Sequence, residues 1–163
     1  MPTISIDGHE HHLYTPETFD AESMQARTKE FYEWADTRRT VRSFSDKPVP
    51  RDVIENILLT ASTAPSGAHK QPWTFCVISS PEMKKQIREA AEEEERKNYK
   101  SRMNDEWLED LRPMATNWQK PFLETVPYLI VVLRRNFEME GTQRHNNYYV
   151  SESVGLACGM LLM

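Results

Sequence analysis

The amino-acid sequence predicts an α+β fold, because signals for buried strands and for amphipathic helices occur in one chain. Residues 73–79 contain the apolar run Thr74–Ile78, and Tyr128–Leu133 is a second apolar run of strand length. Short apolar runs bounded by turn residues are typical of buried strands. Apolar residues in 52–63 recur with a period of roughly 3.6 residues, which indicates a helix packed on a core.

Four further segments are predicted to be helical. Residues 23–37 have apolar side chains at helical spacing, and Pro81 opens a long charged helix over 82–103. Residues 105–124 indicate two short helices broken near Pro113, and another helix begins near Asn147.

The second half of the long charged helix, 92–103, is expected to be a lid. It contains a run of adjacent glutamates and offers little apolar area, so ordering it costs backbone entropy that burial does not offset. We therefore expect a bound ligand to order this segment.

Length, charge and cysteine content limit the class of protein. The chain has 163 residues, enough for one domain with a core, and its formal net charge of −5 argues against nucleic acid as a partner. No apolar run approaches the ~20 residues of a membrane span, and no signal peptide is recognisable. Cys76 and Cys158 lie in apolar segments, as reduced core thiols do. We expect a cytoplasmic protein with no membrane partner.

Residues 1–22 are mixed and polar, and we expect an extended N-terminal arm ahead of a domain over 23–163. His9, His11 and His12 lie close together in this arm. We interpret them as part of a mobile polar tail and predict no metal site.

Two segments indicate a phosphate-bearing ligand. The first is Arg38-Arg39-Thr40-Val41-Arg42, since guanidinium groups form bidentate hydrogen bonds with phosphate. A solvated basic face is the alternative reading of this cluster. The second is the loop 64–73, where Pro65, Ser66 and Gly67 end the preceding helix. A tight loop exposes backbone N–H groups that suit anionic or carbonyl-bearing ligands.

Taken together, these segments resemble the flavin-binding signature of the nitroreductase superfamily. The shared patterns are R-R-[ST]-V-R and P-S-x-x-x-x-Q-P-W, and the variant P-S-G-A-H-x-x-P-W is similar to the iodotyrosine deiodinases of that superfamily. The resemblance implies a nitroreductase-like FMN-binding fold, with a central mixed sheet flanked by helices and a homodimer that encloses the flavin. It implies cofactor contacts from Arg38, Arg39, Thr40, Val41, Arg42, Pro65, Ser66 and Gly67.

The resemblance also gives a role to residues that look ordinary by themselves. Glu95 belongs to a charge run, Lys120 to a polar segment, and a solvated surface explains both. Glu95 and Tyr99 are four apart, so they share a helix face. In the deiodinases such a pair and a later lysine hold the substrate's ammonium and carboxylate. The resemblance thus implies substrate contacts from Glu95, Tyr99, Lys120 and the Ala68 N–H.

The expected activity is FMN-dependent reductive dehalogenation of mono- and diiodotyrosine to tyrosine and halide. The flavin carries the electrons, so no side chain is predicted to be catalytic, and a reductase or NAD(P)H would supply them. The alternatives are a broad NAD(P)H-dependent nitro or quinone reductase and a flavin-binding protein without turnover. Related chains continue past the last helix, so the C-terminal part of the fold is expected to be missing from this sequence.

Overall fold

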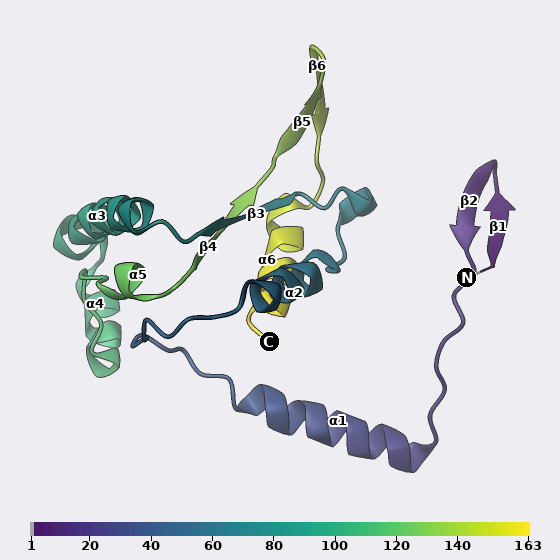
Figure 1. The fold of residues 1–163 in the computed structure, drawn as a ribbon, viewed down its shortest axis with the longest axis horizontal. Coiled ribbons are helices and arrows are strands. Elements are labelled where there is room, and N and C mark those ends of the chain that lie inside the picture. Colours follow the sequence, from purple (N-terminus) through teal and green to yellow (C-terminus); the bar gives the residue numbers. More distant parts are fainter. Residues whose placement is uncertain (1) are drawn as a thin grey trace. The chain divides into compact units, whose positions relative to one another are not determined.

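The computed structural model describes residues 2–163, and the chain divides into two units that meet between Arg39 and Thr40. The first unit holds a hairpin, β1 (Thr3–Ile6) and β2 (His9–His12), and one helix, α1 (Ala21–Asp36) (Figure 1). Its described residues are all exposed or half-buried. The domain boundary at residues 22–23 stays a prediction. In the structure α1 is grouped with the hairpin in the first unit.

The prediction of an extended arm over 1–22 is wrong for its first part. Thr3 pairs with His12 and Ile6 with His9 in an antiparallel ladder. The turn uses Asp7 and Gly8, whose φ values of 51° and 81° are those of a tight two-residue hairpin turn. The Asp-Gly pair is the sequence signal for this hairpin.

The second unit contains the predicted helices and strands together with one unpredicted hairpin. Its elements in chain order are α2 (Arg51–Ser62), β3 (Trp73–Ile78), α3 (Pro81–Lys97), α4 (Asp105–Leu111), α5 (Phe122–Thr125), β4 (Leu129–Arg134), β5 (Phe137–Glu140), β6 (Gln143–Asn146) and α6 (Val150–Leu161). A π-helical turn, Asn98–Arg102, continues α3.

Local capping explains where these helices begin. Ser80 Oγ accepts a hydrogen bond from the Met83 N–H at 3.2 Å, and Pro81 occupies the first turn of α3. Asn104 caps α4 in the same way, through the Trp107 N–H at 2.9 Å.

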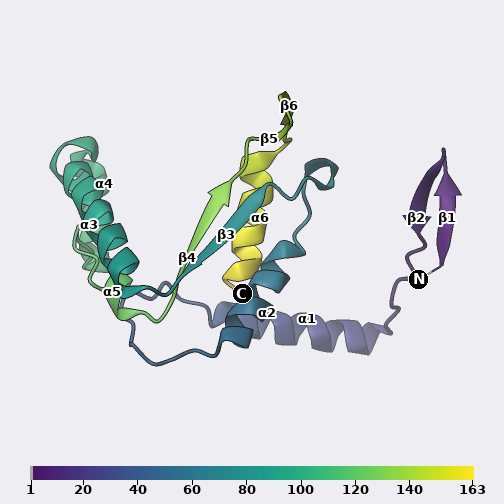
Figure 2. The same cartoon turned by 45° about the horizontal axis from the view of Figure 1, so that its top comes forward.

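The sheet at the centre of the unit pairs β3 with β4 in antiparallel orientation, from Trp73–Arg134 to Ile78–Leu129. Every strand pair among residues 2–163 is antiparallel, so the mixed sheet predicted from the resemblance is not found in this part of the chain. A parallel partner would need a crossover that returns the chain to the end where β3 begins. Here the connection through α3, α4 and α5 leaves β3 at Ile78 and enters β4 at Leu129, which pairs with Ile78, so β4 runs antiparallel to β3 (Figures 1 and 2).

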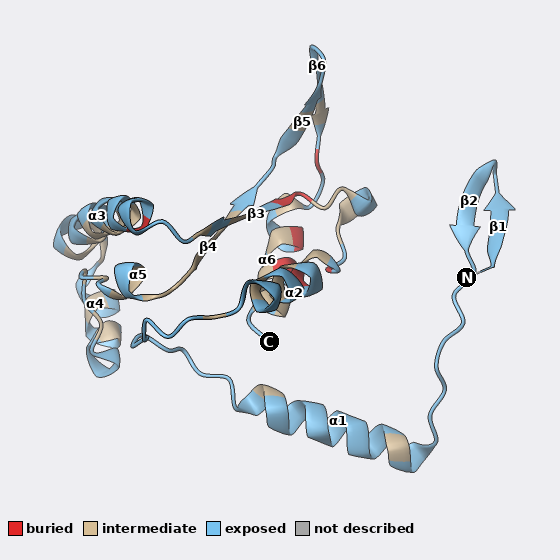
Figure 3. Cartoon of the chain, viewed as in Figure 1, coloured by how far each residue is buried: buried red, intermediate tan, exposed pale blue. Residues whose placement is uncertain are grey.

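The core lies where α2 and α6 pack beside β3. The buried apolar side chains are those of Ala61, Ala64, Trp73 and Ala157, with Pro72 fully enclosed (Figure 3). Many large apolar side chains of the second unit stay exposed, among them Leu59, Leu133 and Leu156. These side chains leave apolar surface available for a further packing partner.

Within residues 2–163, every helix is too short or too polar to cross a lipid bilayer.

We predict that Ala157→Leu destabilises the protein by about 1–3 kcal/mol, because Ala157 is 0% exposed and its neighbours leave no room for three more carbons. Urea denaturation followed by tryptophan fluorescence measures the change. Ala90→Leu makes the same change at an exposed position of α3 and is expected to stay within about 0.5 kcal/mol. Equal effects of the two variants would contradict this description of the core.

Candidate functional site

The loop between α2 and β3 has an unusual backbone. Ala68, His69 and Gln71 have φ values of 47°, 54° and 44°, which are left-handed conformations that residues other than glycine rarely adopt. Such conformations persist where surrounding contacts enforce them and are common at ligand sites. Here the Ser66 Oγ accepts the Gln71 N–H at 2.9 Å, and Arg135 Nη2 donates to the Gln71 carbonyl at 2.9 Å.

The sequence predicts several outward N–H groups in this loop, and in the structure most of them are already bonded within the protein. The His69 and Lys70 N–H groups donate to the carbonyls of Ser66 and Gly67, each at 3.0 Å, and the Gly67 N–H donates to Ser153 Oγ at 3.4 Å. Among the described residues, the Ala68 N–H has no acceptor. The geometry thus leaves the Ala68 N–H, one of the predicted site groups, free to donate to a ligand.

Position 67 requires a glycine because the chain just before α6 passes very close to it. A Cβ placed on Gly67 would lie 2.9 Å from the Tyr148 carbonyl oxygen and 2.9 Å from Tyr149 Cδ2. Tyr149 itself has φ 48° at the start of α6. The loop and the start of α6 therefore form one packed unit, which includes the buried hydroxyl of Ser153.

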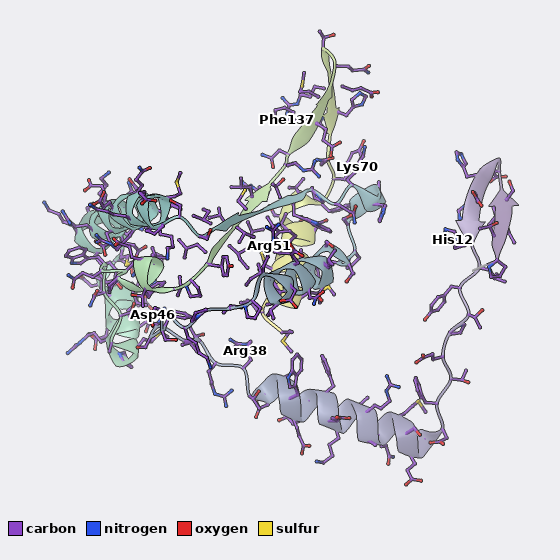
Figure 4. The ribbon with its side chains drawn as sticks, in the orientation of Figure 1. His12, Arg38, Asp46, Arg51, Lys70 and Phe137 are labelled. Carbon is purple, nitrogen blue, oxygen red and sulfur yellow. The ribbon has the colours of Figure 1, made fainter. Side chains whose placement is uncertain are left out.

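The predicted phosphate cluster is split between the two units. Arg38 and Arg39 follow α1 (Figure 4), and all side chains from Arg38 to Arg42 are exposed. Arg42, in the second unit, lines a hollow of about 330 Å³ together with Lys120 and Phe122. Two cationic side chains on one hollow suit an anionic ligand.

The acidic run Glu92–Glu95 lies on the last turns of α3, and each of these glutamates has a basic partner. Lys97 pairs with Glu93 at 3.4 Å and with Glu94 at 2.9 Å, and Arg102 reaches Glu94 at 2.9 Å. Hydrogen bonds from Lys97 and then Arg102 hold the pKa of Glu94 below its ordinary value, and those from Glu94 and Glu93 raise the pKa of Lys97. These pairs offset the repulsion expected among the glutamates of the predicted lid, residues 92–103. That a ligand orders this segment stays a prediction.

Glu95 and Lys120, predicted from the resemblance, lie next to each other. Lys120 Nζ is 3.3 Å from Glu95 Oε2, and the two side chains are 19% and 30% exposed. The ammonium also donates to the Asn117 carbonyl, and Asn98 Nδ2 donates to Glu95 Oε1 at 3.4 Å. Residues 25 positions apart in sequence thus present one negative and one positive group at the same place.

Tyr99 lies in the π-helical turn after α3, half-buried. It lines a hollow of about 440 Å³ with Leu108, Leu111 and Thr116 among its other walls. Thr116 also lines the hollow of Arg42 and Lys120, so the two spaces are neighbours. Single π turns of this kind are frequent at functional sites.

The predicted residues therefore form two groups in one chain. The loop Pro65–Ala68 lies before the Trp73 end of β3. Glu95 and Tyr99 come after Ile78, where β3 ends, and Lys120 comes before Leu129, where β4 begins, so these three belong to the other end of the ladder. Six strand residues at about 3.3 Å each separate the two ends by roughly 17–20 Å. A single chain does not bring the two groups together (Figures 1 and 2).

Sequence reasoning missed a set of residues that support this site. Lys84, Arg88, Glu92 and Arg96 are spaced by four along α3 and all contact the segment around Lys120. Their common spacing on one helix face was the available signal, and a run of charged residues concealed it.

Comparison with known proteins identifies the class. Residues 35–163 match the profile described as the Nitroreductase family, and the chain belongs to this family. The likeness is strong to iodotyrosine deiodinases: the chain is 58% identical over 151 residues to that of Haliscomenobacter hydrossis, covering 91% of this chain and 68% of the relative. It is 44% identical to iodotyrosine deiodinase 1 of Rattus norvegicus, covering 94% of this chain and 54% of the relative.

A solved structure, oxidized iodotyrosine deiodinase bound to FMN and 3-iodo-L-tyrosine, matches with a TM-score of 0.69 at 35% identity, covering 80% of this chain and 66% of that one. The nitroreductase-like α+β fold predicted from the sequence is therefore confirmed. The chain spans between about half and two thirds of the length of these relatives.

We predict that Gly67→Ala destabilises the protein by about 1–3 kcal/mol and weakens any ligand bound at the loop, because the added methyl group collides with Tyr148 and Tyr149. The reciprocal change at the next residue, Ala68→Gly, removes left-handed strain and is expected to leave the midpoint of thermal unfolding unchanged or higher. Differential scanning calorimetry compares the two. An unchanged midpoint for Gly67→Ala would contradict the role given to Gly67.

Proposed function

We propose that the protein catalyses the FMN-dependent reductive dehalogenation of halotyrosines, converting mono- and diiodotyrosine to tyrosine and halide. The single observation that supports this best is the opposed pair Glu95 and Lys120, with its charges 3.3 Å apart. Lys120 lines the hollow that adjoins the hollow of Tyr99. A free amino acid is a zwitterion, and this pair offers it a partner for each charge.

In this proposal the substrate replaces the ion pair between Glu95 and Lys120 with two ion pairs, one between Glu95 and the substrate and one between Lys120 and the substrate. Glu95 accepts hydrogen bonds from the substrate ammonium, and Lys120 donates to its carboxylate. A partly exposed ion pair contributes only about 0–1 kcal/mol, so separating Glu95 from Lys120 costs little. Tyr99 would pack its ring against the substrate and add a hydrogen bond.

The residues of the loop fit a flavin at their own end of the chain. Ser66 and Gly67 lie directly before Ala68 in the chain, and the Ala68 N–H lacks an acceptor among the described residues. Bound FMN would supply the electrons for breaking the carbon–halogen bond. Pro65, Ser66 and Gly67 would border it. Arg38, Arg39, Thr40, Val41 and Arg42 would hold its phosphate. Because Arg42 lines the hollow of Lys120 in one chain, the second chain proposed below would bring the phosphate residues to the loop.

The Ala68 N–H has a further task in this proposal. A halogen next to the phenol hydroxyl brings the substrate's pKa below the ~10 of tyrosine, so the ring can bind as a phenolate. An N–H group without an acceptor then stabilises the phenolate oxygen and fixes the ring over the cofactor.

A homodimer completes the site in this proposal. The loop and the Glu95–Lys120 pair lie at opposite ends of β3 and β4, too far apart for one small substrate. A second chain could bring its own pair to the loop of the first. The exposed apolar side chains of the second unit, such as Leu59, Leu133 and Leu156, support such pairing because a partner would cover them.

The electron source and the location stay predictions. NAD(P)H or a reductase would reduce the flavin. A cytoplasmic location is supported by two cysteines, Cys76 and Cys158, that are both free thiols. The alternatives, a broad nitro or quinone reductase and a flavin-binding protein without turnover, are separated from dehalogenation by the second experiment below.

We expect the full-length protein to purify with FMN and not with FAD, because clustered arginines suit a terminal phosphate monoester. Arg42→Ala should weaken FMN retention by about tenfold or more, since a charge-assisted hydrogen bond contributes about 1.5–3 kcal/mol. Arg51→Ala is the control, because this exposed arginine pairs with Glu55. Chromatography of the acid-released cofactor and fluorescence titration give the readout, and released FAD would refute the assignment.

We expect 3-iodotyrosine to reoxidise the dithionite-reduced protein without oxygen, with one tyrosine and one iodide formed per flavin. Flavin absorbance and product chromatography follow the reaction. Faster reoxidation by nitrobenzene or a quinone would favour the broad reductase. Failure of all these oxidants would favour a binding protein.

A further inference from the structure

One face of α3 holds the segment 118–126 along its length. Lys84, Arg88, Glu92 and Arg96 stand four residues apart, so they form a single stripe on the helix. We call these residues the α3 stripe. Each member contacts the segment at a different point, and the order of contacts runs from Val126 back to Trp118 as the helix proceeds.

The first half of the α3 stripe fixes α5. Lys84 is 7% exposed, and its Nζ donates to the carbonyls of Glu124 at 3.0 Å and Val126 at 2.7 Å. Carbonyls at a helix C-terminus lack partners within the helix, so an ammonium group satisfies them. Arg88 donates through Nε to the Glu124 carboxylate, and this bond raises the pKa of Arg88 above its ordinary value.

Glu92 holds the main chain of Lys120. Its Oε1 accepts the Lys120 N–H at 2.7 Å, and its Oε2 accepts Arg88 Nη1 at 2.8 Å. Its side chain is 13% exposed. Both carboxylate oxygens are therefore engaged, one by the stripe itself and one by the segment.

This contact matters because residues 115–120 contain no helix or strand. A lysine side chain has a long flexible stem, so the position of its ammonium depends on where its main chain is held. Arg96 adds a second attachment, with its guanidinium 4.6 Å from the centre of the Trp118 ring. Glu92 is the member of the α3 stripe that hydrogen-bonds Lys120 directly.

We propose that Glu92 is a positioning residue: it fixes Lys120 opposite Glu95 and thereby sets the preference for ligands that carry a carboxylate. The inference rests on the proposed function, which places the substrate carboxylate at Lys120. Glu92 itself contacts neither substrate nor flavin. Its effect passes through the Lys120 N–H.

The test uses the full-length flavin-loaded protein and two ligands. 3-Iodotyrosine has both an ammonium and a carboxylate, whereas 3-iodotyramine has the ammonium and ring only. We expect Glu92→Ala to weaken 3-iodotyrosine binding by about tenfold, the effect of losing a charge-assisted hydrogen bond, and to leave 3-iodotyramine binding within about twofold. Turnover at saturating 3-iodotyrosine should fall less than the affinity does. Flavin spectral titration and steady-state kinetics give these values.

Two further variants make the test specific. Glu93→Ala removes a neighbouring carboxylate whose 57% exposed side chain pairs with Lys97, and it should leave both affinities unchanged. Glu92→Gln keeps an oxygen acceptor for the Lys120 N–H and loses the charge, so an intermediate effect is expected. Amide exchange measured by NMR should show faster exchange at Lys120 in Glu92→Ala and not in Glu93→Ala.

The outcomes separate this inference from the proposed function. Equal weakening of both ligands by Glu92→Ala, or weakening of neither, would overturn the positioning role while leaving dehalogenation intact. A wild-type protein that binds 3-iodotyrosine no better than 3-iodotyramine would overturn the reading of Lys120 as the carboxylate partner, and with it both proposals.

Discussion

The pairing of β3 with β4 is the constraint on which the arrangement of the second unit depends. It joins residues more than 50 positions apart, from Trp73–Arg134 to Ile78–Leu129, and it sets which segments meet at each end. At the Trp73 end, the loop around Gly67 packs on the start of α6. At the Ile78 end, α3 leaves the ladder and the segment 118–126 returns to it. A slip of one residue would turn the inward face of the slipped strand outward, so the register is fixed by the same burial that forms the core.

Charge organises the Ile78 end much as apolar packing organises the Trp73 end. The outer glutamates of α3, Glu93 and Glu94, form exposed pairs whose main effect is to offset their mutual repulsion. The α3 stripe is different, because Lys84 is buried and Glu92 nearly so. Hydrogen bonds of shielded charged groups are stronger, and losing one partner leaves the other unpaired. An acidic helix therefore presents a solvated face and a structural face within the same run of residues.

Most regular elements could be predicted from the sequence, because their signals are local. Val53, Ile57 and Ala61 repeat at helical spacing in α2, and the apolar runs of β3 and β4 are continuous. The hairpin of β5 and β6 was missed because its strands contain no apolar run, only single residues such as Phe137 and Met139. The mixed sheet came from the resemblance, and strand direction is a long-range property that local patterns do not contain.

The candidate site was predictable in its residues and not in its arrangement. Glu95, Tyr99 and Lys120 were found through the resemblance, and the structure brings Glu95 and Lys120 into contact. Nothing in the sequence indicated that Gly67 and Lys120 lie at opposite ends of one ladder, since that depends on the β3–β4 register. Glu92 was indistinguishable from its neighbours in the acidic run, because its role depends on a backbone N–H 28 residues away.

The proposed specificity depends on recognition of a zwitterion by Glu95 and Lys120. The most direct measurement compares kcat/KM for 3-iodotyrosine with that for 2-iodophenol, which has the same halogen and hydroxyl and neither charge. We expect kcat/KM for 2-iodophenol to be lower by about a hundredfold or more, since two charge-assisted hydrogen bonds of about 1.5–3 kcal/mol each are lost. Comparable values of kcat/KM for the two compounds would contradict it and would leave the pair as an ordinary surface ion pair.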